Sequence, residues 1–322
     1  MDLIKCIKMK QWQLFHELKN KFKGAYYVHR QYILVPGDAP IMLVAHLDTV
    51  HREPVKDICF SDDKNIMMSP QGIGGDDRCG VYALVKVHRE AEVKPWLLFT
   101  CDEEIGGVGA SAFCDDYSLG KIPYDLSVLK ALIEIDRKGS DDAVFYDCDN
   151  VDFERYINSK GFFTSFGSFS DISCIAPEIG VAAVNLSSGY YDAHMQHEHI
   201  VVSELENTIR KVLDIVGESV DPSFPHYEYV EAKYTYNVTK YSQYYGSSLK
   251  KKSEFSWEQY YDDVAASVPK EIQKEYRALL DFYTVTELEE IREEYGDSFI
   301  LSLCRSELGD DYYTKFESVD VE

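Results

Sequence analysis

Four short apolar runs separated by helical patterns constrain the fold of this chain most. They are IMLVAH (41–46), WLLFT (96–100), ALIEID (131–136) and VAAVNL (181–186). Apolar runs of this length are typical of strands that are buried on both faces. Strands that alternate with helices form a mostly parallel sheet with helices on both sides. We therefore predict an α/β fold whose mostly parallel, mixed sheet is sandwiched by helices.

The composition changes near residue 218, which predicts three regions. Residues 1–218 hold all the strand and helix patterns of the sheet, beginning with an amphipathic helix over residues 3–22. Residues 219–252 are rich in tyrosine and have little apolar periodicity, so we interpret them as a linker or an arm. Residues 253–322 are predicted to form a small helical module that ends in an acidic tail.

Net charge and cysteine content limit the classes of partner. The chain has 322 residues and a net charge of −23, which repels phosphate backbones and anionic membranes. We therefore expect neither nucleic acid nor a membrane as a partner. No run approaches the ~18 apolar residues of a membrane span, and the first residues do not read as a signal peptide. The eight cysteines form no C-x-x-C motif, so we expect reduced thiols and a cytoplasmic location.

Acids and histidines follow the apolar runs or stand beside glycines. Each alone has an ordinary structural explanation, such as a buried histidine, a helix cap or a solvated turn. The candidates are His46 and Asp48, Asp76 and Asp77 in GGDDRCG, Glu103 and Glu104 in CDEEIGG, Asp136 in ALIEID, and His194 in GYYDAHMQHEH. The ends of parallel strands meet at one edge of a sheet, where ligands bind, so we expect these side chains to gather there.

Crowded carboxylates favour a metal centre. Carboxylates at one edge repel each other and raise each other's pKa values, and a divalent cation removes that cost. Two histidines and several acids suit two ions ~3.5–4 Å apart that share a carboxylate. Asp48 points to the same side of the strand as His46 and can orient its imidazole. Of two adjacent glutamates, one can bind metal while the other takes a proton.

The ordered set of motifs resembles a known superfamily. HLDTV, G-x-G-G-D-D-R-x-G, D-E-E-x-G-G-x-G-A, a strand-end Asp, and a His with Glu four residues later span residues 41–200. This order is similar to that of the co-catalytic dinuclear zinc exopeptidases, which include bacterial metallo-aminopeptidases and glutamate carboxypeptidase-like enzymes. The resemblance implies a phosphorylase/hydrolase-like zinc peptidase core, with residues 1–218 as the dinuclear metallopeptidase catalytic domain.

The resemblance also implies a role for each candidate. His46 and Asp136 would bind one zinc ion, Glu104 and His194 the other, and Asp76 would bridge the two. Glu103 would be the general base and acid acting on a water held between the ions, and Asp48 would orient His46. His197 remains a rival to His194. Two Zn²⁺ ions are the family's usual metals, and Co²⁺ or Mn²⁺ are alternatives.

The spacing of the last two motifs bears on the substrate. Lidded carboxypeptidases and deacylases of the superfamily insert a domain between the fourth ligand and the final histidine. Here only 58 positions separate Asp136 from His194, so that domain is missing. This favours an aminopeptidase that cleaves short peptides. A carboxypeptidase, a dipeptidase, an N-acyl amino acid deacylase and a non-catalytic binding protein remain alternatives, and a homo-oligomer is left open.

Overall fold

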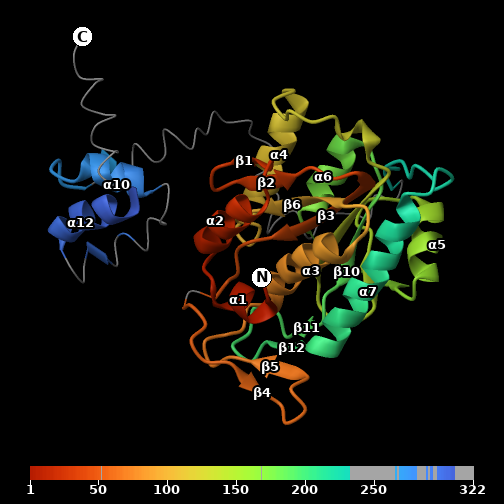
Figure 1. Cartoon of the computed structure of the whole chain (residues 1–322), viewed down its shortest axis with the longest axis horizontal. Helices are drawn as coiled ribbons and strands as arrows, with labels where there is room; N and C mark the ends of the chain where they lie inside the picture. The colour runs from red at the N-terminus through yellow and green to blue at the C-terminus, as the bar shows by residue number, and fades with distance from the viewer. Residues whose placement is uncertain are drawn as a thin grey trace, which may run out of the picture. The chain divides into compact units, whose positions relative to one another are not determined.

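The computed structural model describes residues 1–51, 53–167, 169–232, 265–266, 268–280, 288, 291–292 and 296–308. The chain divides into two compact units, Met1–Tyr234 and Thr235–Glu322. Figure 1 shows the elements of both. Most of the predicted tyrosine-rich arm and the acidic tail lie outside the described residues, so the three-part division stays a prediction.

An eight-stranded mixed sheet forms the centre of the first unit, in the order β1-β2-β6-β3-β7-β10-β8-β9. Its middle strands pair in parallel, β6 with β3, β3 with β7, and β7 with β10. The prediction of a mostly parallel, mixed sheet is therefore confirmed. The strands are β1 (Tyr26–Val28), β2 (Tyr32–Val35), β3 (Ala39–His46), β6 (Pro95–Thr100), β7 (Ala131–Arg137), β8 (Asp142–Val144), β9 (Phe163–Thr164) and β10 (Ala183–Ser187).

A second, antiparallel sheet is smaller and has the order β11-β12-β5-β4. It consists of β4 (Cys59–Phe60), β5 (Ile66–Met68), β11 (Tyr190–Tyr191) and β12 (His199–Val201). Because β5 precedes α3 (Gly75–Glu90) and the loop between β11 and β12 contains His194, this sheet connects the segment before Asp76 with the segment around His194.

Helices cover both faces of the main sheet (Figure 1). Leu43 and Ala45 of β3 belong to the core shared with α1, α2, α3, α5 and α7, whereas Met42 and Val44 belong to the core shared with α4 and α6. The alternation of a strand thus supplies both cores from one apolar run. The helical elements are α1 (Leu3–Lys8), α2 (Gln11–Lys21), α3 (Gly75–Glu90), α4 (Val108–Ser118), the 3₁₀ turn η1 (Leu126–Val128), α5 (Val151–Ser159), α6 (Ile172–Ile179) and α7 (Val202–Ser219).

The single helix that we predicted over residues 3–22 is instead two helices. The backbone is extended at Met9 and Lys10. Arg78 Nη2 donates a hydrogen bond to Met9 O at 3.0 Å, and the side chain of Gln13 accepts one from Lys10 N at 2.9 Å. A buried guanidinium from a distant part of the chain therefore takes the carbonyl at which α1 ends.

The second unit contains α10 (Gln273–Leu279) and α12 (Asp297–Leu308). Its own apolar core includes Tyr276, Leu279, Leu280, Leu288 and Ile300. None of the helices in the described parts of either unit is long and apolar enough to cross a membrane.

The start of α4 depends on a glycine. A Cβ atom on Gly109 would lie 2.2 Å from Gln31 O and 2.5 Å from Cys101 N, both of them backbone atoms that cannot move aside easily. Gly109 N also donates to Cys101 O at 2.9 Å. The close approach therefore fixes α4 against the end of β6.

We predict that Gly109→Ala lowers the free energy of unfolding by about 1–3 kcal/mol, because the added methyl group forces backbone segments apart. Gly217→Ala in α7 is the control, since its Cβ would meet no atom within 4 Å. It should leave stability unchanged or raise it by up to about 1 kcal/mol, the difference in helix propensity. Urea denaturation measures both, and equal stability of the two variants would contradict the prediction.

Candidate metal centre

Parallel pairing of three strands brings the polar segments together at one edge of the main sheet. His46 at the end of β3 is in register with Thr100 at the end of β6, and Val44 is in register with Glu134 of β7. Glu103 and Glu104 therefore leave the sheet beside His46, and Asp136 lies at the same level on the other side. The first residues of α3 and the loop after β11 add Asp76 and His194.

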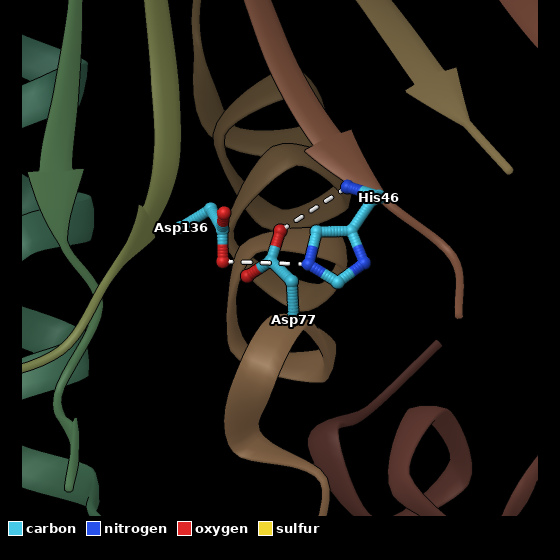
Figure 2. A group of neighbouring side chains, drawn as sticks. All are labelled: His46, Asp77 and Asp136. Atoms are coloured by element: carbon cyan, nitrogen blue, oxygen red, sulfur yellow. Dashed lines mark hydrogen bonds and ion pairs between the residues drawn. The ribbon is translucent and has the colours of Figure 1, made fainter. Parts of the chain in front are cut away.

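The imidazole of His46 is fully buried among three carboxylates. Its Nδ1 lies 3.2 Å from Asp48 Oδ1, and its Nε2 lies 3.0 Å from Asp76 Oδ1. Asp136 Oδ1 is 3.5 Å from the same Nε2 (Figure 2). One ring nitrogen thus contacts Asp48, and the other faces Asp76 and Asp136.

Asp76 lies between two imidazoles. Its Oδ1 faces His46, and its Oδ2 lies 3.2 Å from His194 Nε2. His194 Nε2 is also 3.0 Å from Glu104 Oε2. His197 of the same loop and His199 at the start of β12 lie 3.8 and 3.5 Å from Asp192 Oδ2. The structure therefore brings His194 to Asp76 and Glu104.

Asp77 is adjacent to Asp76, but its carboxylate makes different contacts. Ligand atoms of His46, Asp77 and Asp136 lie within 4.8 Å of one another, the group drawn in Figure 2. Yet Asp77 Oδ2 accepts a hydrogen bond from His46 N at 3.3 Å, and Oδ1 accepts one from Gly80 N at 2.8 Å. Its carboxylate therefore holds the start of α3 against the end of β3, whereas the carboxylate of Asp76 faces imidazole nitrogens.

Asp48 also fixes the segment after β6. Its Oδ1 accepts a hydrogen bond from Glu103 N and its Oδ2 one from Glu104 N, each at 3.0 Å. Burial raises the pKa of Asp48, but the bonds from His46 and the two amides lower it to a net value below normal. Asp48 thus remains a carboxylate that joins the ends of β3 and β6.

The crowding of charge is visible in the pKa values of the metal-free chain. Burial and the charge of Asp76 raise the pKa of Asp136 to about 7, against the opposing effect of His46. Burial raises the pKa of Glu103 to about 9; His46 opposes this, and Asp136 and other acids add to it. Hydrogen bonds with Asp76 and Glu104 raise the pKa of His194 to about 10. Protons therefore offset part of the charge that a cation would otherwise neutralise.

Polar side chains that we did not predict surround Asp136. Asn185 Oδ1 accepts a hydrogen bond from Asp136 N at 2.9 Å, and its Nδ2 donates to Asp136 O at 3.2 Å. Ser170 Oγ donates to Glu134 and lies 3.5 Å from Asp136 Oδ2. Glu134 stands two positions before Asp136 on the same face of β7, so strand alternation could have found it. Ser170 lies in a loop without any periodic pattern, which gave no signal.

Two donor sets suit divalent ions. His46 Nε2, Asp76 Oδ1 and Asp136 Oδ1 form one set; His194 Nε2, Asp76 Oδ2 and Glu104 Oε2 form the other. Glu104 Oε1 and Asp136 Oδ1 are buried and receive no hydrogen bond. Buried carboxylate oxygens without donors are costly unless a cation is near. Mixed imidazole and carboxylate ligands fit zinc, and oxygen-rich sets also fit manganese or cobalt.

We predict that Asp48→Ala lowers the free energy of unfolding of the metal-free protein by about 2–4 kcal/mol, because it leaves the amides of Glu103 and Glu104 without acceptors. Asp62→Ala, at an exposed position, should change it by less than about 0.5 kcal/mol. The check is urea denaturation in the presence of a chelator. A stability loss as small as that of the control would show that the two amides find other partners.

Comparisons with known proteins identify solved structures that have a similar fold. No model of a known protein family matches the chain, and no curated protein matches it. Among solved structures, aminopeptidase PepT from Bacillus cereus ATCC 10987 matches with a TM-score of 0.52 and 16% identity, over 67% of this chain and 96% of that chain. A tripeptidase from Staphylococcus aureus subsp. aureus Mu50 matches with a TM-score of 0.50 and 14% identity, over 67% and 96%. At these identities the likeness concerns the fold: the chain has the mixed α/β fold of these two peptidases.

Proposed function

We propose that this chain is a dinuclear metal-dependent hydrolase of peptide bonds, and that it acts as an aminopeptidase on short peptides. The observation that carries the proposal is the position of Asp76, whose two oxygens face His46 and His194. A carboxylate shared in this way is what two ions at ~3.5–4 Å require. The fold likeness to an aminopeptidase and a tripeptidase supports a peptide substrate.

The connection between Asp136 and His194 supports an aminopeptidase over a lidded enzyme. In the described residues, β8, β9 and β10 follow β7 and all belong to the main sheet. Helix α6 packs on that sheet as well. The segment therefore completes the core of the unit. The described part of this segment holds no inserted domain that would add a group for the carboxylate terminus of a peptide.

We assign the ligands as two overlapping sets. His46 and Asp136 hold one ion, His194 and Glu104 hold the other, and Asp76 contributes one oxygen to each. Zinc is the metal that we propose, with cobalt and manganese as functional substitutes. The free state of all eight cysteines agrees with a reducing compartment, and we propose the cytoplasm.

We also propose roles for the remaining residues. Divalent ions held in these sets would supply Lewis acidity toward the scissile carbonyl and the attacking water. Glu103 would take a proton from the water as its oxygen adds to the carbonyl carbon, and would give a proton to the leaving amine as the C–N bond breaks. Asp48 holds His46 in the tautomer that presents Nε2, and its bonds to the amides of Glu103 and Glu104 fix where the base stands. Asn185 holds the backbone of Asp136 on both sides.

Cleavage of one short peptide in three forms tests the function. The free, N-acetylated and C-amidated peptides are incubated with protein and added zinc, cobalt or manganese, and products are identified by mass. We expect stepwise loss of N-terminal residues that acetylation blocks and amidation does not. Glu103→Gln should lower kcat by about 10²–10⁴-fold while metal content stays the same, because it removes proton transfer alone. Release of C-terminal residues would instead identify a carboxypeptidase.

A pair of histidine variants tests the metal ligands. We predict that His194→Ala retains one divalent ion after dialysis and loses the other, whereas His197→Ala retains two. Both histidines lie in the same loop with exposed side chains, so general damage to the fold should affect them alike. Metal content by mass spectrometry of dialysed protein is the measurement. Loss of metal from His197→Ala alone would reverse the assignment.

A further inference from the structure

Glu198 is a fully buried acid whose carboxylate does not face the metal ligands directly. Its Oε1 accepts a hydrogen bond from Asp76 N at 3.0 Å, and its Oε2 accepts one from Gly74 N at 3.1 Å. His51 Nε2 lies 2.7 Å from the same Oε2. Both oxygens are therefore used within the protein, which leaves Glu198 unsuited to bind a metal ion itself.

The two amides that donate hydrogen bonds to Glu198 belong to the start of α3. The first amides of a helix have no partner inside the helix and need an acceptor from elsewhere. Gly74 occupies the cap position of α3 and provides no side-chain acceptor, and Asp76 has a non-helical backbone. Glu198 supplies the missing acceptor from a distant part of the sequence. It thereby fixes the backbone of the residue whose side chain both ions share.

Three ligand-bearing segments meet at this carboxylate. His51 follows His46 and Asp48 after β3, Asp76 begins α3, and Glu198 itself follows His194 in the loop before β12. The segments pack closely: a Cβ on Gly75 would lie 2.6 Å from Tyr190 Cβ and 3.1 Å from Glu198 Oε1. One on Gly72 would lie 2.2 Å from His51 Nδ1. Glu198 and these close contacts therefore join the three segments directly.

We propose that Glu198 and His51 are positioning residues that set the place of Asp76 relative to His194, and so determine how tightly the second metal ion is held. The inference rests on the proposed dinuclear centre. Glu198 ties the backbone of the shared ligand to the loop that carries His194, and the 3.2 Å spacing of Asp76 Oδ2 and His194 Nε2 depends on that tie. His51, from the segment after β3, contacts the Glu198 carboxylate as well and orients it.

Cobalt(II) titration tests the proposal, followed by visible absorption and calorimetry of the full chain. Wild type should bind two ions. Glu198→Gln should weaken the more loosely bound ion by about 10- to 100-fold and change its absorption bands, because partners that orient ligands contribute this much to affinity. His51→Phe should also weaken the binding of this more loosely bound ion. His51→Gln keeps an N–H donor and should bind the ion with an affinity close to that of wild type.

Glu204→Gln is the matched control, because Glu204 Oε2 accepts a hydrogen bond from Tyr191 OH at 2.6 Å and contacts no amide of α3. It should bind both ions like wild type. Wild-type affinities and spectra in Glu198→Gln and His51→Phe, with only thermal stability lowered, would overturn the inference and leave Glu198 a simple helix cap. If Glu198→Gln does not fold, the cobalt affinities of His51→Phe and His51→Gln test the proposal: equal affinities would overturn it. A wild type that binds no cobalt would overturn the metal centre as well.

Discussion

The parallel pairing of β3 with β6 and β7 is the constraint on which the rest of the site depends. It ends three buried strands at one level, so the residues that follow them must share a small space. Because His46 is in register with Thr100, the segment with Glu103 and Glu104 leaves the sheet beside it. Asp136 comes from the strand on the other side. Buried apolar strands thus determine where charged groups accumulate.

Backbone amides sort the crowded acids into two kinds. Three carboxylates each accept hydrogen bonds from two backbone amides and so hold backbone segments in place; they are Asp48, Asp77 and Glu198. For three others no hydrogen bond from a backbone amide is found in the described residues; they are Asp76, Glu104 and Asp136. Each has an oxygen close to an imidazole nitrogen, and Glu104 Oε1 and Asp136 Oδ1 receive no hydrogen bond. The oxygens of the first kind are occupied by amide donors, whereas those of the second kind remain open to imidazoles or to a cation. This difference separates neighbours such as Asp76 and Asp77, which no composition argument could distinguish.

The sequence predicts the fold, and which polar side chains come close together, where one periodic pattern decides the outcome. Four apolar runs identified the central strands, and alternation placed Asp48 on the side of His46. Contacts between distant segments were not predictable in the same way. At the break between α1 and α2, Arg78 donates a hydrogen bond to the carbonyl of Met9, and the sequence gives no sign of that pairing. Ser170 was missed for the same reason, since its role depends on a loop that reaches Glu134 only after folding.

The long sequence separations in the site have a consequence for synthesis. Glu198 contacts Gly74 and Asp76 across more than a hundred residues, and Asp76 Oδ2 meets His194 across a similar span. Contacts of this kind form late, because a long loop must close before they add stability. A chain still emerging from the ribosome can therefore present His46, Asp76 and Asp136 well before His194 and its anchor exist. In nascent protein the cluster of acids and imidazoles stays incomplete until nearly all of the first unit has been made, so its assembly is among the last events in the folding of this unit.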